Sequence, residues 1–271
     1  VVLAEGHGMT AADPEGKCYL DFTSGIGVNS LGYCHPAWVQ AVCDQAVTLQ
    51  HTSNLYYTQP CAKLAQMLCQ KTGMKKVFFS NSGAEANECA IKVARKYAAE
   101  KKGAEYSTII TLNNSFHGRT LTTLAATGQE HYHELFQPLT PGFVHADAND
   151  LEQLKELTKQ YKVAGILMEC IQGEGGVVAL DKEYAQGAAK LAQEQDIVLM
   201  CDEVQCGNGR SGALYAYMNY GIQPDVVSFA KGIAGGLPLG GILTNEKCAG
   251  VLTPGTHGST FGANPVSTAA G

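Results

Sequence analysis

One carboxylate and one lysine, each at the end of an apolar run, are the residues of this sequence best suited to chemistry. The run Ile197–Cys201 ends in Asp202. The run Val226–Ala230 ends in Lys231, 29 positions after that carboxylate. In an open α/β sheet, groups at the carboxyl ends of strands line the ligand crevice. There a lysine can bond covalently to a cofactor aldehyde while a carboxylate keeps a pyridine nitrogen protonated, which suits pyridoxal 5′-phosphate (PLP). A buried ion pair between the two residues is the alternative.

A glycine-containing turn after the run Val77–Ser80 is a candidate anion site. Ser82 and Glu85 fit a capping box at the start of a helix. Gly83 allows an anion to approach the free N–H groups at the positive end of the helix dipole. Together with Asp202 and Lys231, this pattern predicts a site that binds the phosphate of the cofactor. An ordinary capped helix is the alternative.

The loop Asn114–Arg119 follows an expected strand at 108–112 and therefore reaches the same edge of the sheet. Phe116 can stack on a flat cofactor ring, or it is simply a core residue. His117 is either a base or, more commonly for a lone histidine beside glycine, structural. Arg119 has the planar fork that binds a substrate carboxylate, with an exposed ion pair as its alternative.

Two further patterns were weighed. Glu169 and Glu174 are either pocket acids or solvated loop charges. The segment 207–212 matches the G-x-G-x-x-G pattern of dinucleotide-binding sites. Such a site needs the pattern directly after a strand and an acidic residue at the end of the next strand. Here five residues separate the pattern from the preceding strand and no acidic residue ends the next strand, so we discount a dinucleotide site.

The amino-acid composition excludes several classes of protein. The 271 residues are 45% hydrophobic and 16% charged, as in a compact folded protein. A net charge of −6 without a basic run argues against nucleic acid, and no apolar stretch is long enough to span a bilayer. The ten cysteines, among them Cys43, Cys69, Cys89 and Cys201, have no metal-site spacing. We expect them to be reduced core residues of a cytoplasmic protein that binds no metal.

Apolar periodicity and turn signals predict a mostly parallel sheet with helices on both faces. We expect an N-terminal arm at 1–35, with short strands around 1–3 and 19–22 and a glycine-marked loop at 24–27. One large α/β domain at 36–271 follows. Its expected helices are 36–50, 58–73, 84–101, 120–127, 150–160 and 183–194, and its expected strands are 76–80, 108–112, 164–170, 197–201, 226–230 and 240–244. A turn-rich segment lies after 127, and a helix begins after Pro265.

Six motifs occur together in one order. They are Asn81-Ser-Gly-Ala-Glu-Ala-Asn87, Ser115-Phe-His-Gly-Arg-Thr120, Gln172-Gly-Glu-Gly-Gly176, Asp202-Glu-Val-Gln205, Ser228-Phe-Ala-Lys-Gly232 and His257-Gly-Ser-Thr-Phe-Gly262. In this respect the chain resembles the class III (ω-amino acid) aminotransferases of PLP fold type I, over almost its whole length. The resemblance implies a mostly parallel seven-stranded sheet flanked by helices. It also implies a C-terminal small domain after this large domain. Because the helix expected after Pro265 has barely begun at Gly271, we expect the sequence to be truncated before that domain.

The resemblance implies roles for individual residues. Lys231 would hold the cofactor covalently and move a proton, and Asp202 would bind the ring nitrogen. Phe116 and Val204 would sandwich the ring, with Gln205 on its phenolic oxygen. The phosphate would be held by Ser82, Gly83 and Ala84, and by Thr260 from the neighbouring subunit of a homodimer. Substrate would be bound by Arg119 through its α-carboxylate, by Glu174, which pairs in the family with an arginine of the small domain, and by Ser259.

The activity that the resemblance implies is transfer of the δ-amine of N²-acetyl-L-ornithine to 2-oxoglutarate, in arginine biosynthesis. The loop Ser24–Gly27 carries no tyrosine to bind a free α-amine, which favours an acylated donor over ornithine. Succinylornithine, succinyldiaminopimelate and 4-aminobutyrate remain alternative donors, because an apolar pocket discriminates weakly. An aminomutase or racemase of the same fold, or an inactive truncated paralogue, also remains open.

Overall fold

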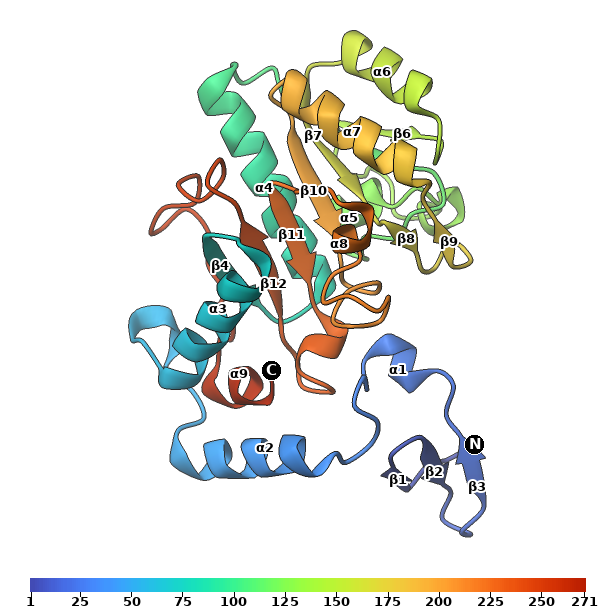
Figure 1. Ribbon diagram of the computed structural model, residues 1–271, viewed down its shortest axis with the longest axis vertical. Coiled ribbons are helices and arrows are strands. Elements are labelled where there is room, and N and C mark those ends of the chain that lie inside the picture. The colour runs from blue at the N-terminus through green and yellow to red at the C-terminus, as the bar shows by residue number, and fades with distance from the viewer.

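The computed structural model describes residues 1–271, and a seven-stranded sheet forms its centre (Figure 1). The order across the sheet is β4 (Lys76–Ser80), β12 (Gly240–Thr244), β11 (Val226–Phe229), β10 (Val198–Asp202), β7 (Val163–Met168), β5 (Thr108–Leu112) and β6 (Phe143–Ala146). Strand β12 is antiparallel to both neighbours, and the other six strands run in one direction. The predicted mostly parallel sheet is confirmed. The carboxyl ends of β4, β5, β7, β10 and β11 therefore meet at one edge.

Helices cover both faces of this sheet, as predicted. Helix α4 (Gly83–Lys101) lies on one face, where its alanines form an apolar core with Val198, Met200 and Val226. Alternate strand residues such as Leu199 and Val227 point to the other face and form the larger core. That core is covered by α3 (Gln59–Thr72), α6 (Leu151–Gln160), α7 (Lys182–Glu194) and α8 (Tyr217–Tyr220). Helix α5 (Leu121–Ala126) contacts α4 and β6, and α9 (Pro265–Ala270) contacts α2 (Pro36–Thr48) and α3.

The N-terminal 35 residues build a separate small sheet, seen to one side of the main sheet in Figure 1. Its strands are β1 (Glu5–His7), β2 (Thr10–Ala12) and β3 (Cys18–Leu20), and the short α1 (Ser24–Gly27) and then α2 (Pro36–Thr48) follow. The expected strand at 1–3 is wrong, because those residues pair with no strand. The division into an arm and a large domain stays a prediction.

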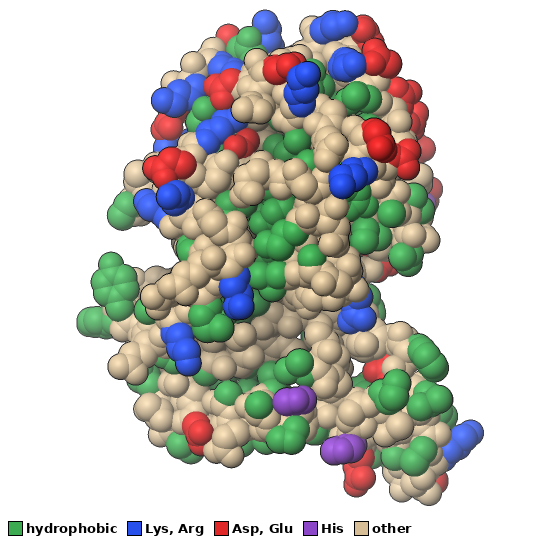
Figure 2. Space-filling view, viewed as in Figure 1, with side chains coloured by type: hydrophobic (Ala, Val, Ile, Leu, Met, Phe, Trp, Pro, Cys, Tyr) green, Lys and Arg blue, Asp and Glu red, His purple; other side chains and the backbone are tan.

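Exposed apolar side chains gather on this part of the chain. Helix α2 buries no residue, and Phe22, Val47, Leu55 and Tyr57 are each more than 80% exposed. Figure 2 shows hydrophobic side chains on the lower part of the molecule as it is drawn there. No helix is both long and apolar enough to cross a membrane.

Most expected elements occur within two residues of their predicted ends, and the exceptions have local causes. Strand β6 was read as part of a turn-rich segment, because Pro138, Pro141 and Gly142 precede its four residues. As an edge strand it pairs only with β5, and His145 bonds Thr111 Oγ1 across that pair at 2.7 Å. The two-stranded hairpin of β8 (Ile171–Gln172) and β9 (Val178–Ala179) was also missed.

No disulfide joins the ten cysteines, and no group of acidic, histidine and cysteine side chains is arranged to hold a metal ion. The expected core position holds for Cys89 and Cys201. It is wrong for Cys18, Cys34 and Cys43, which are exposed, and Cys61 and Cys69 are only partly buried.

Glycines in β12 let this strand approach its neighbours closely. A Cβ at Gly240 would lie 2.6 Å from the carbonyl oxygen of Ser82. A Cβ at Gly241 would overlap the carbonyl oxygen of Phe78 and lie 2.8 Å from the Phe229 ring. Backbone atoms and a buried aromatic ring can move aside only at a large cost in free energy, so these positions require glycine.

Gly241→Ala is therefore expected to destabilise the fold by about 3 kcal/mol, which would lower the melting temperature by roughly 6–12 °C. Differential scanning calorimetry measures this shift. The matched control is Gly250→Ala, because a Cβ there would meet nothing within 4 Å. Equal melting temperatures for the two variants would contradict the close approach of β12.

Candidate active site

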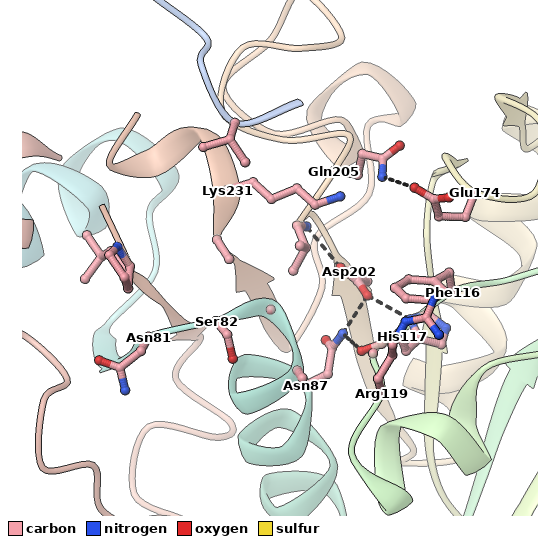
Figure 3. A pocket seen from close by; sticks show the side chains of 18 of the residues that line it. Asn81, Ser82, Asn87, Phe116, His117, Arg119, Glu174, Asp202, Gln205 and Lys231 are labelled. Atoms are coloured by element: carbon pink, nitrogen blue, oxygen red, sulfur yellow. Dashed lines mark hydrogen bonds and ion pairs between the residues drawn. The ribbon is translucent and has the colours of Figure 1, made fainter. Parts of the chain in front are cut away.

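A cavity of about 500 Å³ opens at the edge where the carboxyl ends of the strands meet. Asp202 ends β10 and Lys231 follows β11, and both side chains line this cavity (Figure 3). Of the twelve residues predicted to bind cofactor or substrate, ten line it. These ten are Ser82, Gly83, Ala84, Phe116, Arg119, Glu174, Asp202, Val204, Gln205 and Lys231.

The Asp202 carboxylate is 2% exposed and is held by three donors. Its Oδ2 accepts hydrogen bonds from Asn87 Nδ2 and His117 Nδ1, both at 2.7 Å. Its Oδ1 accepts one from the backbone N–H of Val204 at 3.0 Å. A carboxylate has about four acceptor positions, so one acceptor position is left for a donor in the cavity.

The Lys231 side chain forms no hydrogen bond or ion pair, and the side chains bonded to the Asp202 carboxylate are Asn87 and His117. The alternative of a buried Asp202–Lys231 ion pair is therefore wrong. Burial lowers the pKa of the Lys231 amine, while the carboxylates of Asp202, Glu174 and Glu169 act in the opposite direction. Its backbone has φ +51°, in the left-handed region that disfavours residues with a Cβ. The site thus contains an unpaired lysine that loses its proton more readily than a solvated one.

The start of α4 faces the cavity with free donors. Ser82 is the N-cap, and its Oγ accepts from the Glu85 N–H at 3.2 Å. The predicted capping box is only half formed, because the Glu85 carboxylate returns to the N–H of Asn81 rather than to that of Ser82. The backbone N–H groups of Ser82, Gly83 and Ala84 consequently have no acceptor in the chain.

Gly83 also has a packing reason to be glycine. A Cβ there would lie 2.7 Å from a methyl group of Val204. The three free N–H groups therefore stand directly beside the turn that carries Val204. The donor set and the shape of this corner fit a phosphate.

Glu169 lines the cavity and is buried, so the alternative of a solvated loop charge is wrong for this residue. It is 4% exposed, and its carboxylate accepts from the N–H groups of Phe116 at 2.9 Å and Gly173 at 3.1 Å. Burial raises the pKa of Glu169 to about 7. This residue joins the loop after β5 to the loop after β7.

Glu174 is exposed at the rim of the cavity, where its Oε1 accepts from Gln205 Nε2 at 3.0 Å (Figure 3). Arg119 is also exposed, and its guanidinium lies over the Tyr132 ring at 4.7 Å and the Phe116 ring at 5.7 Å. The alternative of an ion pair for Arg119 is wrong, because no acidic side chain contacts it.

Ser259 and Thr260 lie outside the cavity of their own chain. Ser259 Oγ accepts from Asn81 Nδ2 at 3.1 Å and from the Gly262 N–H at 3.0 Å. Thr260 is exposed. Neither residue touches the space between Asp202 and Lys231.

Two side chains hold Asp202, and sequence reasoning missed one of them. Asn87 lies on the buried face of α4, four residues before Ile91 and seven before Ala94, and a polar residue at that spacing was the available signal. His117 is 2% exposed and its Nδ1 bonds the Asp202 carboxylate, which agrees with the structural alternative for this residue, although its partner was not predicted.

Comparisons with known proteins agree with this geometry. The profile of the family Aminotransferase class-III matches residues 1–271. The chain is 56% identical to the acetylornithine aminotransferase of Haemophilus ducreyi, covering 100% of this chain and 69% of that protein. It is 48% identical to the succinylornithine transaminase of Citrobacter koseri, covering 99% of this chain and 66% of that protein.

The structure superposes on the ornithine aminotransferase of Toxoplasma gondii with a TM-score of 0.95 and 35% identity. The match covers 100% of this chain and 65% of that protein, whose active site is partially occupied by PLP. The chain thus spans about two thirds of the length of the relatives it matches. On its sequence and its fold, the chain belongs to the class III aminotransferase family.

Proposed function

We propose that this chain is the PLP-binding part of an aminotransferase that moves the δ-amine of N²-acetyl-L-ornithine to 2-oxoglutarate. The products are N-acetylglutamate 5-semialdehyde and L-glutamate. The observation that carries the proposal is the cavity that holds both the buried Asp202 carboxylate and the unpaired Lys231 amine. Bound PLP would supply a carbonyl that bonds to amines and a protonated ring that withdraws electrons from the substrate.

The residues of the chain would bind and orient this cofactor. Ser82, Gly83 and Ala84 would donate their free N–H groups to its phosphate. Asp202 would accept a hydrogen bond from the ring nitrogen with its remaining acceptor position. The ring would be sandwiched by Phe116 and Val204 and contacted at its phenolic oxygen by Gln205, all of which line the cavity.

Lys231 would move the proton between the substrate carbon and the cofactor. A base must be neutral to accept a proton, and burial lowers the pKa of this amine toward the working range. Arg119 would bind the substrate α-carboxylate, and Glu174 would line the substrate site beside it. Ser259 lies outside the cavity of its own chain, so it would contact substrate only in the neighbouring subunit of the dimer proposed below.

We further propose a cytoplasmic homodimer in which Thr260 reaches the phosphate held by the neighbouring subunit. Its exposure, outside the cavity of its own chain, supports this role. The large domain would be 36–271 and the arm 1–35. The 48% identity to a succinylornithine transaminase makes succinylornithine the second candidate donor.

Cofactor uptake tests the role of Lys231. Because a lysine with a lowered pKa is neutral at lower pH than a solvated one, the rate of PLP uptake should rise with pH and level off below the pH at which a solvated lysine would do so. Absorbance spectroscopy at a series of pH values measures this rate. After borohydride reduction, mass spectrometry should find the cofactor on the peptide that contains Lys231.

Lys231→Met should abolish the reducible attachment, whereas the control Lys182→Met, at an exposed lysine of α7, should retain it. Attachment to another lysine in both proteins would refute the assignment.

A panel of amino donors tests the reaction. With 2-oxoglutarate as acceptor, kcat/KM for acetylornithine should exceed that for ornithine by roughly tenfold or more, because an apolar loop does not solvate a free α-ammonium. Glutamate formation measures the rate, and 4-aminobutyrate and succinylornithine complete the panel. Donor alone should release one equivalent of semialdehyde, which an aminomutase or racemase would not do. A preference for 4-aminobutyrate would overturn the substrate assignment.

A further inference from the structure

The Arg119 guanidinium is held only by aromatic rings. It lies 4.7 Å from the centre of the Tyr132 ring and 5.7 Å from that of Phe116, and no acidic side chain or carbonyl accepts from it. An aromatic ring offers a guanidinium no oxygen acceptor, so its five N–H donors stay available for hydrogen bonds. The donors of Arg119 therefore stay free at the rim of the cavity, beside Phe116 (Figure 3).

The Tyr132 ring is itself fixed in place. It meets Phe116 edge-on, with centroids 5.7 Å apart and planes at 73°. It lies in the 3₁₀ turn Glu130–Tyr132, and the next residue, His133, bonds the carbonyl oxygens of Leu124 and Thr127 through Nε2 at 2.8 Å. Helix α5 thus anchors the turn that carries Tyr132.

Tyr132 does not line the cavity, so its contact with the site runs through Arg119 and Phe116. An exposed arginine without ion pairs samples many rotamers, and binding a ligand must first fix one of them. The contacts with the two rings restrict these rotamers before a ligand binds and so remove part of that cost. A guanidinium held in this way needs less ordering to bind a carboxylate with two hydrogen bonds.

We propose that Tyr132 is a positioning residue for Arg119, and that it sets the preference of the site for ligands that carry a carboxylate. The proposal rests on the proposed function, in which Arg119 binds the substrate carboxylate. It adds a residue outside the cavity to the determinants of specificity.

The test measures binding of glutarate and of its uncharged diamide, glutaramide, to the PLP-loaded full chain by isothermal titration calorimetry. Tyr132→Leu should weaken glutarate binding by about threefold to tenfold and glutaramide binding by less than about twofold. Tyr132→Phe retains the ring and should restore glutarate affinity to within about twofold of the original. The matched control is Tyr161→Leu, at an exposed tyrosine that ends α6.

A double-mutant cycle separates the two proposals. If Tyr132 acts through Arg119, Tyr132→Leu should have no further effect on glutarate binding in an Arg119→Leu protein. Additive losses, or equal losses for glutarate and glutaramide in Tyr132→Leu, would overturn the positioning role while leaving the carboxylate role of Arg119 intact. Equal glutarate affinity in the original protein and Arg119→Leu would instead overturn the carboxylate role in the proposed function, and the positioning role with it.

Discussion

The arrangement of the site depends on the hydrogen bonds that hold one buried carboxylate, Asp202. Removing a carboxylate from water costs several kcal/mol unless donors replace the lost hydration. The donors come from three places: Asn87 in α4, His117 in the loop after β5, and the N–H of Val204 in the turn after β10. Asn87 and His117 are 115 and 85 positions away from Asp202 in the sequence. The carboxylate is therefore stable only when the helix, the loop and the strand are all in place.

Helix α4 connects the two ends of the cavity. Its first turn presents the free N–H groups of Ser82 and Gly83, and Asn87, just over one turn later, supports Asp202. Because a helix is rigid over so short a length, the anion position and the carboxylate lie at a nearly fixed separation. Gly83 adds to this constraint, since a side chain there would displace Val204. This separation is what the proposed function requires for a ligand with an anion at one end and a hydrogen-bond donor at the other.

The sequence predicted the parts of this structure that are locally encoded. Asp202 and Lys231 end apolar runs, so their shared edge follows from parallel strands alone. Asn87 was missed because a single polar residue in a helix does not indicate its partner 115 positions away. Strand β6 was missed because an edge strand of four residues owes its order to pairing with β5 rather than to its own pattern. The half-formed capping box at Ser82 has the same origin: whether Glu85 returns to Ser82 or to Asn81 is decided by how the turn packs, which residue types do not specify.

Lys231 combines two features that each destabilise the folded chain. Its left-handed backbone costs about 1–2 kcal/mol relative to a relaxed residue. Its amine is removed from water without an ion-pair partner, which is why its pKa is lowered. Strand β11, paired on both sides in the sheet, holds the preceding residues firmly enough to sustain both costs. A glycine would relieve the cost of the left-handed backbone, and a residue without a charge would relieve the cost of burial. The stability of the fold therefore does not explain a lysine at this position. What a lysine offers is an amine that lines the cavity, and this is the group that the proposed function requires.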